Sequence, residues 1–155
     1  MKASLLAVFC VCAIATVSAA TSTPDFTGAW VFNAAKSKNI GMMASAQITS
    51  TIKQTHKKLT VVDDTTMGGQ KQSHETDYDL TGKRVDNESP MGEHSQTSSK
   101  WSGNKLITTW ETEGAVAGTK VIRIEKRYLS DDGKTMFLES ARGSNPSMII
   151  AFDRE

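Results

Sequence analysis

Apolar and polar residues alternate in short runs from residue 26 to the end of the chain, and glycine- or asparagine-containing turns separate the runs. Alternation with a period of two, in runs rich in threonine, isoleucine and valine, is typical of β-strands buried on one face. The pattern predicts strands at Phe26–Phe32, Gln47–Thr55, Leu59–Thr66, Lys71–Asp79, Lys83–Asn87, His94–Trp101, Lys105–Thr112, Lys120–Leu129, Thr135–Arg142 and Ser147–Asp153.

Tight turns join most of these strands in chain order. Gly68-Gly69, Thr81-Gly82, Gly103-Asn104 and Asp131-Asp132-Gly133 supply the positive φ angles that hairpin turns require. Short strands joined in sequence favour an antiparallel meander, and closing it into a barrel removes exposed sheet edges. We therefore expect an all-β, antiparallel up-and-down β-barrel of roughly 8–10 strands. The segment 34–45 has room for at most one short helix after the first strand.

The first 20 residues form a cleavable export signal by their pattern. Lys2 is followed by the apolar run Leu5–Val17 and then by small residues suited to cleavage. That run is shorter than the roughly 20 residues that a membrane-spanning helix needs. Residues 21–155 are expected to form a single domain that is secreted or periplasmic, with no membrane insertion. Cys10 and Cys12 both lie in the signal, which excludes a disulfide, a thiolate metal site and a cysteine nucleophile from the mature chain.

Charge narrows the possible partners further. The chain has 18 lysine and arginine residues against 17 acidic ones. Lys2 leaves with the signal, so the mature domain is expected to be neutral. Basic and acidic residues are interspersed, and no basic stripe interleaved with aromatic residues occurs. The electrostatic pattern for binding nucleic acid or an anionic membrane is therefore missing.

The first predicted strand carries a family resemblance. Phe26-Thr27-Gly28-Ala29-Trp30 resembles the Gly-x-Trp opening of the lipocalin and fatty-acid-binding superfamily, the calycins. The segments 25–37, 100–106 and 128–135 resemble small exported lipocalin-like proteins of bacteria, which are largely uncharacterised. The resemblance implies that Gly28 and Trp30 are structural and that Trp30 plugs the closed end of the barrel.

In lipocalins an arginine from a late strand covers the equivalent tryptophan. Arg127, Arg142 and Arg154 are equal candidates for that role in this chain. The helix-turn-helix lid of intracellular fatty-acid-binding proteins has too little room in this chain, because too few residues separate Phe32 from Gln47.

The hairpin turns predict which side chains face inward, because a slip of one residue would turn every side chain to the other face. A Gly68-Gly69 turn places Asp63 opposite His74, Val61 opposite Thr76, and Leu59 opposite Tyr78. The apolar residues mark this face as buried. A Thr81-Gly82 turn likewise places Tyr78 opposite Val85, and a Gly103-Asn104 turn places Trp101 opposite Leu106.

The buried face of the central strands is unusually polar in this register, with Asp63, Gln72, His74, Thr76, Ser95, Thr97, Ser99 and Thr108. A buried hydroxyl or amide without a partner costs roughly 1–3 kcal/mol, so this face needs water, a ligand or an internal network. The first and last strands supply a dry core instead, from Phe26, Trp30, Phe32, Ile48, Ile52, Ile150 and Phe152. Two interpretations follow: a barrel with one apolar end and a half-polar cavity, or central strands that form an open sheet facing solvent.

The function that this pattern favours is binding of a small hydrophobic or amphipathic molecule. Tyr78 and Trp110 would supply apolar contact, while His74, Thr97 and Ser99 would orient the ligand by hydrogen bonds. No cofactor is expected. The alternative is a protein-interaction module, such as an inhibitor or envelope subunit, that acts through its loops without a ligand. An apolar patch of Met91 and Ala115-Val116-Ala117 at one barrel end would favour that alternative.

Three other groups of residues were considered for metal binding, catalysis and carboxylate binding, and the pattern of each is incomplete. His56, His74 and His94 lack the spacing of metal ligands, so no metal site is predicted. Asp63 and His74 have the composition of half a catalytic unit, but no Gly-x-Ser-x-Gly elbow accompanies them. A salt-bridged structural pair and no enzymatic activity are expected. Lys126 and Tyr128 resemble the basic-x-Tyr pair that holds a carboxylate in fatty-acid-binding proteins, although that pair lies in the last strand; an outward-facing lysine is the alternative.

Overall fold

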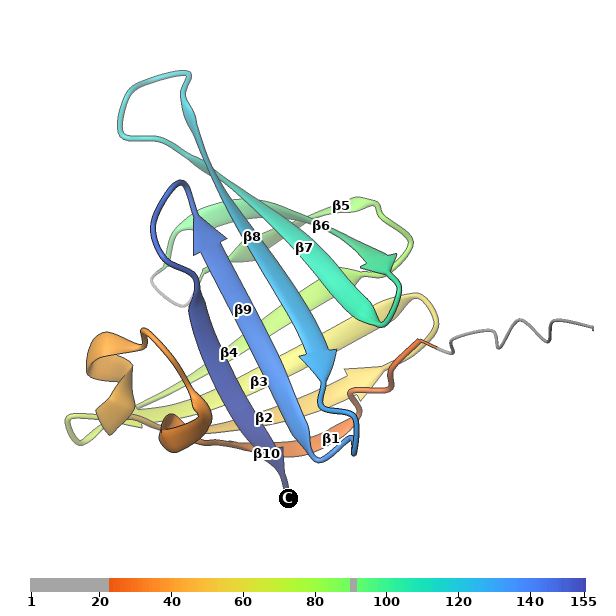
Figure 1. Cartoon of the computed structure of the whole chain (residues 1–155). Coiled ribbons are helices and arrows are strands. Elements are labelled where there is room, and N and C mark those ends of the chain that lie inside the picture. The colour runs from red at the N-terminus through yellow and green to blue at the C-terminus, as the bar shows by residue number, and fades with distance from the viewer. Residues whose placement is uncertain (1–22, 90–91) are drawn as a thin grey trace, which may run out of the picture.

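A single antiparallel sheet curls into a nearly closed barrel (Figure 1). The computed structural model describes residues 23–89 and 92–155. The described elements are β1 (Gly28–Phe32), η1 (Ala34–Lys36), η2 (Gly41–Ser45), β2 (Gln47–Gln54), β3 (Lys58–Met67), β4 (Gln70–Asp79), β5 (Arg84–Glu88), β6 (His94–Ser102), β7 (Lys105–Glu113), β8 (Lys120–Leu129), β9 (Thr135–Arg142) and β10 (Met148–Arg154). The predicted strands are thus confirmed, with bounds that differ by one or two residues. The segment expected to hold at most one short helix forms the two 3-10 turns η1 and η2.

The strand order in the sheet is β4-β3-β2-β1-β10-β9-β8-β7-β6-β5. Pairing of β1 with β10 brings the two ends of the described chain together, which a meander alone would not do. The ladders confirm the predicted registers Asp63↔His74, Leu59↔Tyr78 and Trp101↔Leu106. Two-residue turns therefore determine the facing of residues on β3, β4, β6 and β7.

The hairpin expected at the Thr81-Gly82 turn lacks main-chain pairing between its two strands. The strands β4 and β5 are the two edges of the sheet, so the predicted pairing of Tyr78 with Val85 is wrong. A side chain bridges the two edges instead. Asn87 Nδ2 donates to the Asp77 carbonyl at 2.8 Å, and the Asp77 amide donates to Asn87 Oδ1 at 3.2 Å. Asn87 thereby takes the place of one main-chain pair across the β4–β5 gap.

The closed end of the barrel is filled by an apolar core. Phe26, Trp30, Ile52, Leu59, Leu106 and Met136 are all fully buried. Phe26 stacks on Trp101 with the ring centroids 6.0 Å apart, and Trp30 Nε1 donates to the Phe26 carbonyl at 2.8 Å. Trp30 was expected to be a structural residue at the closed end, and its complete burial supports this role.

Arg154 is the arginine that covers Trp30. Its guanidinium carbon lies 4.3 Å from the centre of the Trp30 ring, within the range of a cation–π contact. Arg154 Nη1 also donates to the Thr27 carbonyl at 3.0 Å. Gly28 makes room for this arrangement, because a Cβ at this position would lie 3.1 Å from Arg154 Nη1. Its φ of +137° is also one that residues with side chains rarely adopt.

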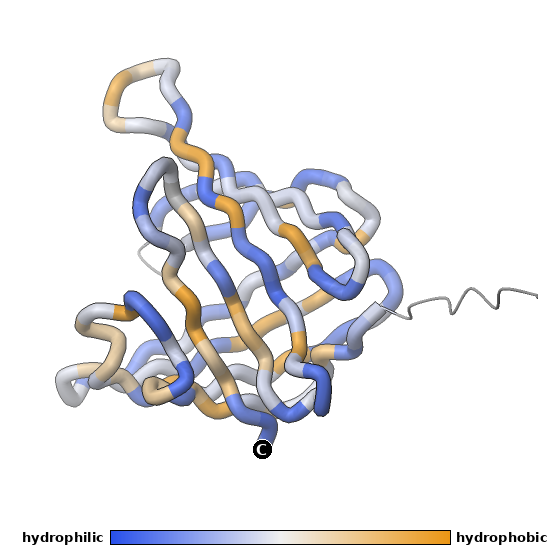
Figure 2. Tube along the Cα trace, viewed as in Figure 1, coloured by the Kyte–Doolittle hydropathy of each residue, from blue (hydrophilic) through white to orange (hydrophobic). Residues whose placement is uncertain are grey.

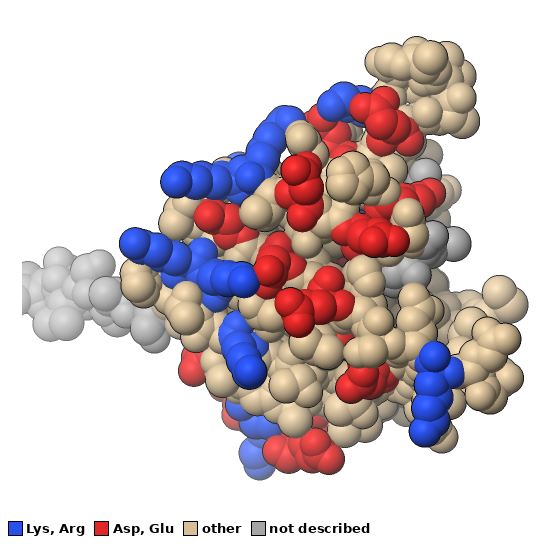
Figure 3. Space-filling view, turned by 180° about the vertical axis from the view of Figure 1, so that it is seen from behind, with Lys and Arg blue, Asp and Glu red and all other residues tan. Residues whose placement is uncertain are grey.

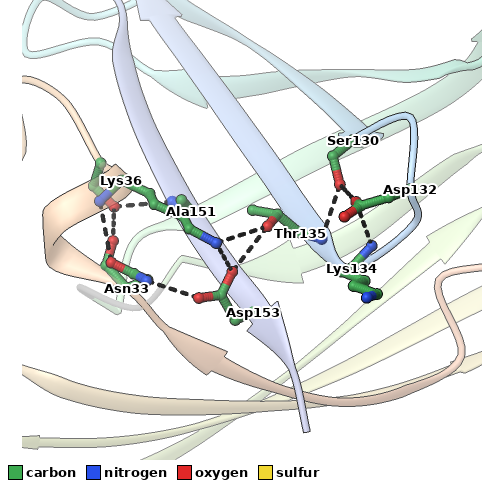
Figure 4. A network of polar contacts seen from close by, with 9 residues as sticks. Asn33, Lys36, Ser130, Asp132, Lys134, Thr135, Ala151 and Asp153 are labelled. Carbon is green, nitrogen blue, oxygen red and sulfur yellow. Dashed lines mark hydrogen bonds and ion pairs between the residues drawn. The ribbon is translucent and has the colours of Figure 1, made fainter.

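A polar network ties η1 to the last two strands (Figure 4). The Asp153 carboxylate accepts hydrogen bonds from Lys36 Nζ at 2.6 Å, Asn33 Nδ2 at 2.7 Å and Thr135 Oγ1 at 2.9 Å. The hydrogen bond from Lys36, the largest of these effects, lowers the pKa of Asp153 below its usual value. Ser37 Oγ accepts from the Ala151 amide at 2.9 Å and completes the attachment. The segment after β1 is therefore fixed against β10.

Hydrophobic and hydrophilic residues alternate along the strands (Figure 2). On the face turned away from the view of Figure 1, acidic and basic side chains lie among one another and among uncharged residues (Figure 3). Within the described part of the chain, no helix is long and apolar enough to cross a membrane.

Candidate ligand site inside the barrel

The strand β8 presents Arg123, Glu125 and Arg127 to the barrel interior and its two isoleucines to the outside. Its register with β7 pairs Arg127 with Leu106, Glu125 with Thr108, and Arg123 with Trp110. Leu106, Thr108 and Trp110 are buried, so their partners face inward too. Accordingly Glu125 and Arg127 are only 7% and 6% exposed, whereas the isoleucines at 122 and 124 are 42% and 41% exposed.

Two of these inward arginines flank an aromatic pair. Tyr78 and Trp110 meet edge to face, with ring centroids 6.1 Å apart and an interplanar angle of 82°. The guanidinium carbon of Arg123 lies 4.5 Å from the Trp110 ring centre, and that of Arg127 lies 5.8 Å from the Tyr78 ring centre. The predicted ligand residues Tyr78 and Trp110 are therefore in contact, between two cationic groups that sequence reasoning had missed.

The two arginines differ in their partners. Arg123 Nη2 lies 3.3 Å from Glu125 Oε1, which makes an ion pair inside the barrel. Arg127 Nη1 donates to the sulfur of Met136 at 3.5 Å, and no carboxylate within the described residues forms an ion pair with Arg127. Arg123, whose side chain is 32% exposed, thus has an ion-pair partner, whereas the buried Arg127 has none within the described residues. A buried guanidinium without an ion-pair partner is costly and suits a site that receives an anion.

Burial also controls the protonation of Tyr78. Desolvation is the main cause that raises its pKa far above the ordinary value, and the nearby Glu125 carboxylate adds to the effect. The phenol therefore keeps its proton to a higher pH than an exposed tyrosine does, and its hydroxyl is able to donate a hydrogen bond.

Two buried nitrogen atoms complete the polar interior. Trp110 Nε1 and His74 Nε2 have no hydrogen-bond partner within the described part of the chain. A buried donor left without a partner costs about 1–3 kcal/mol. Trp110 Nε1 can only donate, so its natural partner is an acceptor such as a carboxylate oxygen.

The hydroxyls of the predicted ligand residues Thr97 and Ser99 already have protein partners. Thr97 Oγ1 accepts from Asn87 Nδ2 at 2.7 Å, and Ser99 Oγ lies 2.9 Å from Thr108 Oγ1. These bonds satisfy part of the polar face internally. They also link Thr97 to the bridge across the β4–β5 gap.

Asp63 and His74 face each other in the ladder, as predicted. The expected salt bridge is nevertheless not formed, since no ion pair or hydrogen bond joins them among the described residues. Direct opposition in a ladder places Cα atoms close but leaves the long side chains free to diverge. The geometry therefore gives no support to catalysis by this pair.

Other candidates lie on the outside. Lys126 Nζ pairs with Glu139 Oε1 at 3.0 Å, and Tyr128 stacks on Phe137 at a centroid distance of 5.4 Å. Both residues face away from the interior, so the outward-lysine interpretation holds. No group of three or more potential ligands within the described residues is placed to hold a metal ion.

The loop between β7 and β8 projects well beyond the barrel (Figure 1). Val116 near its tip is 67% exposed. Met91, the other part of the predicted apolar patch, lies outside the described residues. A patch formed by both is therefore not established.

Comparisons with known proteins agree on the fold. No protein-family model matches the chain, and no curated protein matches it. Solved structures do resemble it. A structure titled "REP1-NXSQ fatty acid transporter" superposes with a TM-score of 0.65 at 18% identity, covering 83% of this chain and 95% of that one. Human cRBP IV gives a TM-score of 0.64 at 14% identity, covering 85% and 99%.

A Schistosoma mansoni fatty-acid-binding protein in complex with arachidonic acid gives a TM-score of 0.63 at 18% identity, over 84% of this chain and 96% of that one. Identities this low show a shared fold. The chain therefore has the same β-barrel fold as these solved structures.

Proposed function

We propose that this protein binds an amphipathic molecule with an anionic head group inside its barrel, and that it acts by binding rather than by catalysis. The observation that carries the proposal is Arg127, a buried guanidinium without a carboxylate partner in the described chain. Trp110, whose ring meets that of Tyr78, has a second donor without a partner in the described chain, its indole nitrogen. Together they offer a carboxylate both charge and directed hydrogen bonds.

Apolar side chains would contact the tail of such a ligand. Trp30, Leu59 and Leu106 belong to one buried apolar cluster that also includes Tyr78 and Trp110. Several structural neighbours are named as fatty-acid-binding proteins or transporters, which supports a lipid-like ligand. A basic-x-Tyr pair in the last strand does not supply the head-group contact here, because the arginines lie on β8.

The proposal includes export. A signal-like segment precedes the domain and the mature chain lacks cysteine, which suits a secreted or periplasmic binding protein, as in the exported bacterial lipocalin-like proteins that the sequence resembles.

Substituting Arg127 tests the binding site. We expect R127M to lower the affinity for a long-chain fatty acid about 10- to 100-fold, because hydrogen bonds to charged groups contribute roughly 1.5–3 kcal/mol. The same variant should unfold at an equal or higher temperature than the parent, because it removes a buried charge that has no ion-pair partner. Titration followed by tryptophan fluorescence gives the affinity, and calorimetry gives the unfolding temperature.

K126M is the matched control, since Lys126 is adjacent on β8 but faces outward. It should bind like the parent. The parent should also prefer the fatty acid over the alcohol of equal chain length, and R127M should lose that preference. Equal binding of the acid by R127M and the parent, or no binding of any compound by the parent, would refute the proposal.

A further inference from the structure

One side of β4 is an open sheet edge. The strand order begins at β4 and ends at β5, so each of these strands has one neighbour in the ladder. An edge strand presents main-chain N–H and C=O groups that another extended chain can pair with. The hairpin of β3 and β4 extends beyond the body of the sheet (Figure 1), which keeps the start of β4 away from the strands across the gap.

The residues whose main chain faces the gap follow from Asp77. In an antiparallel ladder, successive residues direct their N–H and C=O groups to opposite sides. Both main-chain groups of Asp77 bond to Asn87 and therefore face away from β3. By alternation, Lys71, Ser73 and Glu75 face the same way. Within the described chain none of the three has a main-chain hydrogen bond on that side, and all three are exposed.

This set of residues is complementary to itself. When a second β4 is placed antiparallel, with a two-fold axis at Ser73, each Ser73 lies opposite its own copy. Lys71 then lies opposite Glu75 in both directions, and every outward main-chain group of the three residues finds a partner. Opposite charges in directly facing positions stabilise a strand pair.

Neighbouring registers fit less well. Moving the axis by one residue toward the hairpin turn places Lys71 opposite Ser73 and leaves no charge pair. Moving the axis by one residue away from the turn would pair Lys71 with Asp77. The main-chain groups of Asp77 are already bonded to Asn87 and are not available for that pairing. The register centred on Ser73 therefore uses all of the available groups and both charges.

The outer face beside this edge is also accessible. A surface hollow of about 540 Å³ lies over β2, β3 and β4, and Asp64, Lys71 and Ser73 contribute to its wall. A second copy can therefore approach along this strand.

We propose that two copies of this protein associate through antiparallel pairing of their β4 strands, centred on Ser73. The contact joins the two sheets edge to edge and is isologous, as expected for a two-fold dimer. It is independent of any ligand in the barrel, so it stands or fails separately from the binding function.

Sedimentation velocity over a range of protein concentrations tests the pairing. The parent should show a concentration-dependent monomer–dimer equilibrium. K71E and E75K should each weaken dimerisation by at least about tenfold, because each places like charges opposite one another. The double variant K71E/E75K should restore dimerisation to within about threefold of the parent, because the opposite charges are exchanged.

S73P provides a main-chain test. It removes the central N–H that faces the second copy, and proline is tolerated at an edge where that N–H is not bonded within the sheet. S73P should abolish the dimer while keeping the unfolding temperature of the monomer, and K53E on the exposed face of β2 serves as the charge control. A parent that stays monomeric at every concentration overturns the proposal. So does a dimer that neither S73P nor K71E weakens.

Discussion

At the residue scale, conformation and environment assign roles that residue type alone leaves open. Three arginines were equal candidates to cover Trp30, and the contact at 4.3 Å selects Arg154. Arg127 lies instead in the interior against Tyr78. The same residue type thus covers Trp30 at the closed end of the barrel in one place and supplies a buried charge without an ion-pair partner to a candidate ligand site in the other.

Gly28 gives a prediction at this scale. We expect G28A to lower the free energy of unfolding by about 1–3 kcal/mol, because alanine is strained at positive φ and its Cβ would displace the Arg154 guanidinium. Urea unfolding measures the change. G68A at the β3–β4 turn is the control: its φ is also positive, but no atom lies within 4 Å of an added Cβ. A loss in G28A no greater than in G68A would show that the contact with Arg154 contributes nothing.

At the element scale, two features depart from what the local pattern suggests. Along β8, isoleucine alternates with charged residues, and the charged set faces inward. Between β4 and β5, a tight turn is present but the ladder is replaced by the Asn87 side chain. Such departures from local rules are expected where a protein keeps a functional site.

The Asn87 bridge can be tested directly. N87A should lower the free energy of unfolding by about 2–4 kcal/mol, because it leaves the main chain of Asp77 and the hydroxyl of Thr97 without their buried partner. Hydrogen exchange should speed up at the Asp77 amide and along β5 more than along β2 and β3. Uniform acceleration across the whole sheet would mean that Asn87 contributes to global stability without joining these two edges.

At the scale of the whole molecule, one sheet forms two chemically distinct compartments. The closed end is built mainly from apolar side chains, while the half bounded by β4, β6, β7 and β8 carries most of the buried polar and charged side chains. An amphipathic ligand is a natural occupant of an interior divided in this way.

The export proposal is tested on the whole chain. Expression of residues 1–155 in a host with a secretory pathway should yield a protein that begins at Thr21 and is recovered from the periplasm or medium. N-terminal sequencing and mass determination check this outcome. Retention of residues 1–20 on a protein found only inside the cell would contradict it.

The sequence by itself determined the fold class, the strands and the facing of residues in the hairpins turned by Gly68-Gly69 and Gly103-Asn104. These features follow from alternation and turn chemistry, which are local. The inward facing of Tyr78 and Trp110 was predicted in this way, because two-residue turns determine the register between neighbouring strands.

Three features were decided only by the tertiary structure. They are the side of β8 that faces the interior, the gap between β4 and β5, and the selection of Arg154 as the arginine that covers Trp30. The longer loop between β7 and β8 breaks the residue count, so alternation alone cannot say which set of side chains faces inward. The gap and the arginine depend on contacts between residues far apart in the chain. Arg127 is buried because the pairing of β8 with β7 sets which side of β8 faces the interior, although the other side carries the isoleucines. The candidate head-group site is a consequence of this pairing.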